Sequence, residues 1–170
     1  KEDLCNLITS KLSGYLFVVV SNREPYVHTF SGRKIECQVP ASGLTVALDP
    51  VMQACGGTWV AHGSGNADRE VVDKDNKVRV PPEDPRYSLK RVWLSKQEEE
   101  EYYLGFSNEA LWPLCHVVYT RPVFEESDWN TYRKVNEMFA ETVHEEVGDR
   151  KAFVFIQDYH LALLSRLIKE

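Results

Sequence analysis

The sequence lacks the long apolar run of a membrane protein and the excess of positive charge of a nucleic-acid-binding protein. No apolar stretch approaches the roughly 20 residues that span a bilayer, and the start, Lys-Glu-Asp-Leu, does not have the shape of a signal peptide. The 170 residues carry 20 basic and 26 acidic side chains, whereas non-specific nucleic-acid binding needs a basic face. We therefore expect a soluble, cytoplasmic protein that binds neither a membrane nor nucleic acid.

The sequence is also poor in cysteine, and its cysteines do not form a recognisable pattern. They are scattered, with no C-x-x-C pair and no histidine at metal-ligand spacing. Because three of them lie in or near apolar runs, we predict reduced thiols that act as small buried hydrophobic residues. Neither a metal nor another cofactor is expected. The four cysteines are Cys5, Cys37, Cys55 and Cys115.

Two common catalytic signatures are missing. Gly63 and Gly65 follow an apolar segment, but Arg69 and Glu70 stand where the third glycine of a dinucleotide fingerprint would fall. A nicotinamide-dependent dehydrogenase is therefore disfavoured. The sequence has no G-x-S-x-G elbow, which disfavours a Ser-His-Asp hydrolase.

Apolar runs and helical periods alternate along the chain, and this alternation predicts an α/β fold with a largely parallel sheet. Continuous apolar runs of this kind are typical of strands that are buried on both faces. Strands are predicted at residues 15–20, 58–62, 115–119 and 152–156. Helices are predicted at residues 43–55, capped by Ser42 and stopped by Gly56, and at residues 130–147.

Two segments between these elements have a distinct composition. Residues 66–85 are polar and end in a proline-rich stretch, so we expect an exposed loop, with an edge hairpin as the alternative for its valines. Ser95 and Glu98 have the spacing of a capping box, and residues 98–101 should form a solvated acidic helix face. Residues 102–113 follow as a predicted turn rich in aromatic rings, which suit either a buried core or the apolar face of a sugar.

Polar residues follow the predicted strands, where ligands bind in parallel sheets. Arg23 comes after the first strand and is read either as a phosphate ligand or as half of a surface ion pair with Glu24. Gly43 opens a helix, where it suits either a diphosphate or a simple cap. His62 is read as a ligand, as a base or as structure. Asp158 follows the last strand, and its carboxylate can accept hydrogen bonds from sugar hydroxyls.

Five motifs occur in a characteristic order. They are Ser-Asn-Arg at 21–23, Ser-Gly-Leu at 42–44, Tyr-Tyr-x-x-Phe-Ser-Asn-x-x-Leu-Trp-Pro at 102–113, Asp-Trp-x-x-Tyr-x-x-Val-Asn-x-x-Phe-Ala at 128–140 and Asp-Tyr-His-Leu at 158–161. Together they resemble the amino-terminal half of the trehalose-6-phosphate synthase family, from about Leu16 to the end of the chain.

The resemblance implies a retaining GT-B glycosyltransferase, built from two facing Rossmann-like domains, that moves glucose from UDP-glucose to glucose 6-phosphate. Residues 1–170 would be the amino-terminal, acceptor-side domain of a longer enzyme. They would be inactive alone, because the carboxyl-terminal domain supplies half of the cleft. The resemblance requires no cofactor and leaves the donor nucleotide and a homo-oligomer open.

The same resemblance implies roles for individual residues. Arg23, Tyr103 and Trp112 would bind the acceptor phosphate, and Asp158 would act at the catalytic centre by holding acceptor hydroxyls. Ser42 and Gly43 would lie on the loop against the donor diphosphate.

Three positions depart from the family pattern, which usually has Gly-Gly where this chain has Ser42 and Gly43, Trp at His62, and His at Gln157. His62 is expected to contact the acceptor, so its exchange for the usual Trp bears on which acceptor is used. A glucosylglycerol-phosphate synthase is the nearest alternative enzyme. A non-catalytic module that senses sugar phosphates is the alternative from another class.

Overall fold

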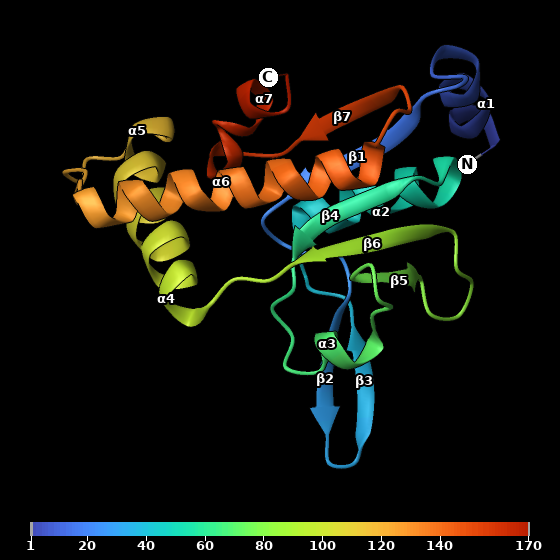
Figure 1. Cartoon of the computed structure of the whole chain (residues 1–170), viewed down its shortest axis with the longest axis horizontal. Helices are drawn as coiled ribbons and strands as arrows, with labels where there is room; N and C mark the ends of the chain where they lie inside the picture. The colour runs from blue at the N-terminus through green and yellow to red at the C-terminus, as the bar shows by residue number, and fades with distance from the viewer. Residues whose placement is uncertain (1, 170) are drawn as a thin grey trace.

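The computed structural model describes residues 2–169 and centres on a five-stranded, mostly parallel sheet (Figure 1). The strand order is β5-β6-β4-β1-β7, and only β5 runs antiparallel to its neighbour. This arrangement confirms the predicted α/β class. The strands are β1 (Leu16–Ser21), β4 (Thr58–His62), β5 (Lys77–Val80), β6 (Tyr87–Val92) and β7 (Ala152–Ile156).

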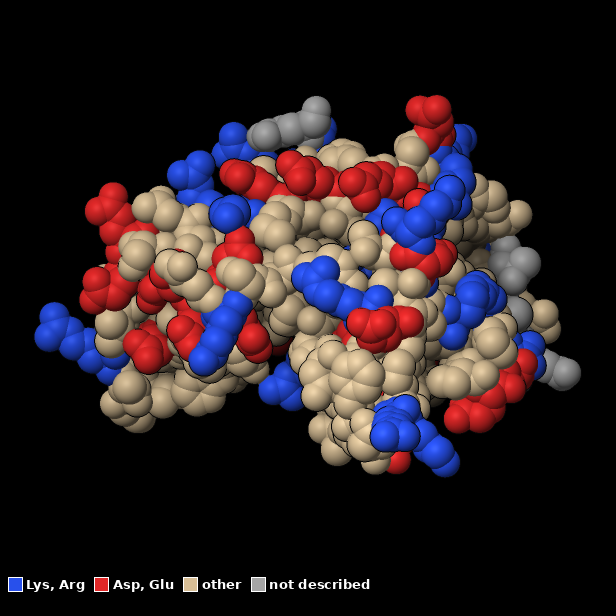
Figure 2. Space-filling model, turned by 60° about the horizontal axis from the view of Figure 1, so that its bottom comes forward, with Lys and Arg blue, Asp and Glu red and all other residues tan. Residues whose placement is uncertain are grey.

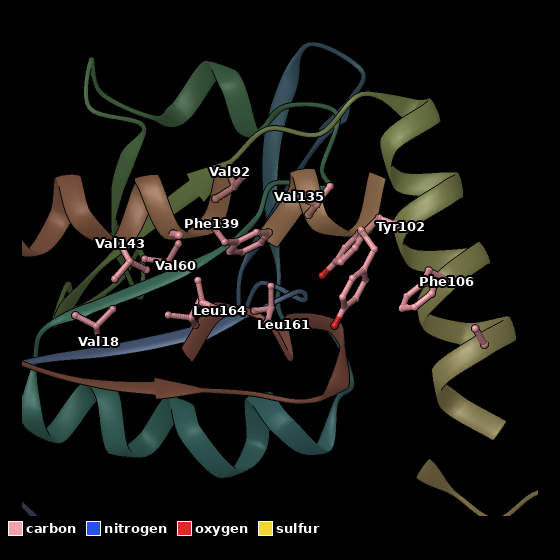
Figure 3. Close-up of a cluster of buried hydrophobic side chains, with 14 residues drawn as sticks. Val18, Val60, Val92, Tyr102, Phe106, Val135, Phe139, Val143, Leu161 and Leu164 are labelled. Atoms are coloured by element: carbon pink, nitrogen blue, oxygen red, sulfur yellow. The ribbon is translucent and has the colours of Figure 1, made fainter. Parts of the chain in front are cut away.

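Helices cover both faces of this sheet. The long helix α6 crosses one face and α2 lies on the other, as Figure 3 shows in side view. A separate antiparallel hairpin, β2 (Val27–Ser31) with β3 (Lys34–Gln38), projects away from the sheet (Figure 1). The helices are α1 (Glu2–Lys11), α2 (Gly43–Cys55), α3 (Asp68–Val71), α4 (Lys96–Glu99), the π-helix η1 (Glu100–Leu111), α5 (Trp112–Cys115), α6 (Glu126–Val147), the 3-10 helix η2 (Tyr159–Leu161) and α7 (Leu164–Leu167).

The two faces of the sheet form two cores, because successive side chains of a strand point to opposite sides. Val18 and Val20 pack in the cluster under α6 (Figure 3), whereas Val19 packs with Met52 of α2. The continuous apolar run of β1 is therefore buried on both faces, as predicted. The prediction is wrong for β7, which lies at the edge of the sheet and leaves Phe153 44% exposed.

The middle of the chain corrects several predictions. The strand predicted at residues 115–119 is wrong, because Cys115 ends α5 and Tyr119 is fully exposed. Residues 66–85 contain α3 and the strand β5, so they are not one loop. The edge hairpin predicted within this segment is also wrong, because β5 pairs with β6, which lies outside it. A short apolar run cannot distinguish strand from helix end by its period alone, which explains the first error.

The aromatic segment forms a helix where a turn was predicted. Ser95 and Glu98 form the predicted capping box, and helical structure then continues through α4, η1 and α5. Glu98 binds Lys134 and Glu101 accepts a hydrogen bond from Thr131, so the acidic face is partly engaged with α6. Gly105 and the tyrosines around it are weak helix formers, so propensity does not explain this continuity. Packing of Tyr102 and Phe106 against α6 explains it instead, because tertiary contacts stabilise a helix more than propensity does.

The cysteines are less buried than predicted. Cys37 and Cys115 are exposed free thiols, and Cys55 is half-buried. The prediction of small buried residues is therefore wrong for the first two, whose neighbouring apolar residues belong to an exposed hairpin and a helix end. The side chain of Cys5 lies outside the described part of the structure. On the face that Figure 2 shows, basic and acidic side chains are interspersed, in keeping with the mixed charge of the sequence.

Candidate functional site

A cavity of about 490 Å³ opens at the carboxyl edge of the sheet. The ends of β1 and β7, the start of α2 and the aromatic helix contribute its lining. Five of the predicted site residues line it together, although up to 135 positions separate them in the sequence (158 minus 23). They are Arg23, Ser42, Tyr103, Trp112 and Asp158.

Arg23 lies just beyond β1 with its guanidinium exposed to the cavity. Its Nη2 donates a hydrogen bond of 3.1 Å to the Tyr103 hydroxyl, and this bond raises the pKa of Arg23. The Ser21 hydroxyl donates to the Arg23 carbonyl at 2.6 Å and so fixes the backbone there. The ion-pair interpretation with Glu24 is wrong, because that carboxylate is bound by Arg91 instead.

The aromatic helix contributes side chains both to the core and to the lining of the cavity. Tyr102 and Phe106 are buried in the core under α6 (Figure 3). Tyr103 and Trp112 face the cavity, and Trp112 is 39% exposed. Neighbouring tyrosines thus have different roles, since Tyr102 packs inward while Tyr103 bonds to Arg23.

Asp158 holds an unusual backbone conformation at the end of β7. Its φ of 72° and ψ of 166° lie in a region that glycine adopts and other residues avoid. Its carboxylate accepts a hydrogen bond of 2.8 Å from the Tyr159 N–H and so caps η2. The side chain is about half exposed and lines the cavity opposite Arg23 and Tyr103.

The start of α2 lies beside the cavity, with Ser42 in its lining. The predicted cap is wrong in one respect, because the Ser42 side chain makes no capping hydrogen bond within residues 2–169. Gly43 is exposed, and a Cβ there would meet no atom within 4 Å, so packing does not require a glycine. Space therefore remains at the positive end of a 13-residue helix.

His62 lies apart from most of the predicted site. Its imidazole is buried at the end of β4, with Nδ1 3.2 Å from the Val92 carbonyl oxygen. It lines a second cavity, of about 340 Å³, which it shares with Arg23 and Tyr103 but not with Asp158. The bridge between Arg23 and Tyr103 thus borders both cavities.

Sequence reasoning missed a buried charged cluster behind Arg23. Arg91 of β6 donates to the Glu24 carboxylate at 2.8 Å and lies 2.7 Å from an Asp68 carboxylate oxygen. The Ser64 N–H also donates to Glu24 at 2.8 Å. Burial and the neighbouring Asp68 raise the pKa of Glu24 to about 8, against the effect of Arg91. No strand was predicted at residues 87–92, so nothing in the sequence indicated that Arg91 would be buried within β6.

His160 and Tyr159 were also missed as part of the site, although both belong to the Asp-Tyr-His-Leu motif. They line the cavity beside Asp158. Within residues 2–169, no group of three or more His, Cys, Asp or Glu side chains is placed to hold a metal ion. The helices of the same residues are too short or too polar for any of them to cross a membrane.

The fold and cavity define an α/β domain with a cavity at the carboxyl edge of its mostly parallel sheet, where ligands bind in folds of this class. The family model described as glycosyltransferase family 20 matches residues 15–170, and the chain belongs to this family. This confirms the resemblance found in the motifs.

Curated relatives are similar over most of the chain. The trehalose-6-phosphate synthase of Mycolicibacterium vanbaalenii is 34% identical over 162 residues, which are 94% of this chain and 32% of the relative. The trehalose-6-phosphate synthase of Mycolicibacterium paratuberculosis is 35% identical over 165 residues, which are 95% of this chain and 32% of the relative. The chain thus spans about a third of the length of these relatives.

Solved structures agree with the fold. The E. coli trehalose-6-phosphate protein bound with UDP-2-fluoro glucose has a TM-score of 0.65 and 28% identity, over 90% of this chain and 30% of that one. A Burkholderia vietnamiensis trehalose-phosphate synthase has a TM-score of 0.65 and 23% identity, over 91% and 29%. The predicted Rossmann-like domain of a GT-B glycosyltransferase is therefore confirmed as the fold of this chain.

Proposed function

We propose that this chain is the amino-terminal, acceptor-side part of a trehalose-6-phosphate synthase, which transfers glucose from UDP-glucose to glucose 6-phosphate. The main observation behind this proposal is that the hydrogen-bonded pair Arg23 and Tyr103 lines the same cavity as Asp158. Similarity to trehalose-6-phosphate synthases supports the product, and the E. coli structure bound with UDP-2-fluoro glucose supports the donor.

The cavity residues divide between the two ends of a sugar phosphate. At one end, the planar guanidinium of Arg23 can hold two phosphate oxygens, and the Tyr103 hydroxyl can donate to a third. Trp112 offers an indole N–H and an apolar face beside them. At the other end, Asp158 accepts hydrogen bonds from sugar hydroxyls and so orients the one that reacts.

The donor would lie across the start of α2. Ser42 and Gly43 leave the free N–H groups and the positive dipole end of this helix open to a diphosphate. A carboxyl-terminal domain of the longer enzyme would close over the donor and supply the remaining charge. This chain's residues therefore bind and orient, and the proposal assigns no covalent nucleophile to them.

Two alternatives remain to be separated. A glucosylglycerol-phosphate synthase would use a smaller acceptor, glycerol 3-phosphate, and the position of His62 in a second cavity beside Arg23 is the observation that favours testing it. A sensing module would bind glucose 6-phosphate without transfer by the complete protein. Comparing both acceptors, and then assaying transfer, distinguishes the three.

The first experiment is a titration of the chain with glucose 6-phosphate, followed by tryptophan fluorescence. Trp112 is 39% exposed in the cavity, whereas Trp59 is fully buried in the sheet, so Trp112 should report occupancy. Trp112→Phe should abolish the signal and identify the reporter. Saturable binding by glucose 6-phosphate, and much weaker binding by glucose or inorganic phosphate, is expected. Equal binding of glucose 6-phosphate and inorganic phosphate, or no binding, would contradict the acceptor site.

A further inference from the structure

His160 lines the cavity, contacts both Tyr103 and Asp158, and is 9% exposed. Its imidazole stacks on the Tyr103 ring, with centroids 5.3 Å apart and an interplanar angle of 15°. It also stacks on the Tyr159 ring, with centroids 4.3 Å apart and an interplanar angle of 26°. The ring therefore supports the tyrosine that bonds to Arg23.

The same imidazole reaches the other end of the cavity. Its Nδ1 lies 3.6 Å from a carboxylate oxygen of Asp158. The backbone of His160 is held in place, because the Asn136 side chain donates to the His160 carbonyl at 3.2 Å and holds η2 against α6. One buried side chain thus contacts both a residue proposed to bind phosphate and the residue proposed to bind hydroxyls.

The charge state of the ring suits this position. Burial lowers the pKa of His160, and Arg23 lowers it further, while the Asp158 carboxylate raises it. The rings of Tyr102, Tyr103 and Tyr159 also pack against the imidazole, and burial raises the pKa of the Tyr102 and Tyr159 hydroxyls. A neutral imidazole that presents Nδ1–H to Asp158 leaves Nε2 as an acceptor, and Nε2 has no hydrogen-bond partner within the described residues.

We propose that His160 is a positioning residue that couples the two parts of the acceptor site. The face of its ring orients Tyr103 toward the phosphate, and its Nδ1 orients the Asp158 carboxylate toward the sugar hydroxyls. This inference rests on the proposed function. It makes discrimination between glucose 6-phosphate and inorganic phosphate depend on a residue that need not contact either ligand.

Two reciprocal variants separate the face from the edge. His160→Phe keeps a planar ring against Tyr103 and removes the nitrogen next to Asp158. It should weaken glucose 6-phosphate about tenfold and leave inorganic phosphate within about twofold, because Asp158 loses the polar nitrogen that lies 3.6 Å from its carboxylate. His160→Asn keeps a donor near the Nδ1 position and removes the ring, so it should weaken both ligands.

Calorimetric titration of wild type, both variants and His144→Phe provides the test. His144 is exposed on α6, away from the cavity, and its substitution controls for replacing a histidine by a phenylalanine. Equal weakening of both ligands in His160→Phe, or no weakening in either variant, would overturn the proposal. Circular dichroism shows whether each variant is folded. If one variant does not fold, the other still tests the proposal.

A ligand-free measurement keeps this proposal distinct from the proposed function. In an NMR titration of the histidine ring protons, Asp158→Asn should lower the pKa of His160, because the carboxylate that raises it is gone. An unchanged pKa would refute the pairing whatever the chain binds. Failure of wild type to bind glucose 6-phosphate, with this shift present, would instead count against the proposed function.

Discussion

The backbone of Asp158 predicts that two substitutions with the same loss of function differ in stability. A non-glycine residue at φ 72° and ψ 166° carries strain of about 1–3 kcal/mol, since this conformation is essentially restricted to glycine. Asp158→Gly relieves that strain, but the greater freedom of glycine in the unfolded chain lowers the stability of the fold by about 0.5–1 kcal/mol. Asp158→Ala keeps the strain, and both substitutions remove the carboxylate that caps η2, so the cap does not separate the two variants.

Urea unfolding of the two variants measures the difference. We expect Asp158→Gly to be more stable than Asp158→Ala by about 1 kcal/mol, with equal m-values. Both should lose discrimination between glucose 6-phosphate and inorganic phosphate, because both lack the carboxylate. Asp158→Asn is the matched control, since it keeps a side-chain oxygen for the cap. Equal stability of the glycine and alanine variants would refute the reasoning from strain.

Three further predictions concern Arg23 and the cluster behind it. Arg23→Ala should weaken glucose 6-phosphate by about 2 kcal/mol or more, measured by calorimetry, and unchanged affinity would remove Arg23 from the site. Arg91→Met should destabilise the fold by about 3–5 kcal/mol in urea, because it leaves the buried Asp68 carboxylate without its cation and the buried Glu24 carboxyl without its hydrogen-bond donor, and a loss below about 1 kcal/mol would contradict their pairing. The pKa of Glu24 is raised from 4.5 to about 8, so its contribution to stability is complete below pH 4.5 and is lost as pH rises through 8. Glu24→Gln should remove this slope of unfolding free energy against pH, whereas the exposed Glu99→Gln should keep it.

The strands and main helices could be predicted because their signals are local. The apolar run of β7 predicted its bounds of 152–156 correctly, and the capping box predicted the start of α4 at Ser95. The failures have a common cause in tertiary context. Residues 115–119 have the composition of a strand but lack a neighbour to pair with at a helix end, and β7 has the composition of a central strand but lies at an edge.

The site was predictable where residues follow strands and not where they act through other residues. Arg23 and Asp158 were found because each comes directly after a predicted parallel strand. His62 follows a strand equally closely, yet it turns into the second cavity, a distinction of side-chain direction that spacing does not contain. Arg91 lies inside β6 and reaches the site only through Glu24, so only the folded structure connects them.

The position of the Arg91 cluster bears on how the site is held together. Glu24 is the next residue after Arg23, and it is fixed by Arg91 from β6 and by the Ser64 N–H beyond β4. Three neighbouring strand ends are thus tied directly behind the exposed guanidinium. A flexible Arg23 would lose side-chain and backbone entropy each time it bound a phosphate, whereas a backbone fixed in advance has already lost most of it. In the proposed site the buried charges would therefore contribute to ligand affinity through order more than through attraction, so Glu24→Gln should affect stability against pH more than it affects binding.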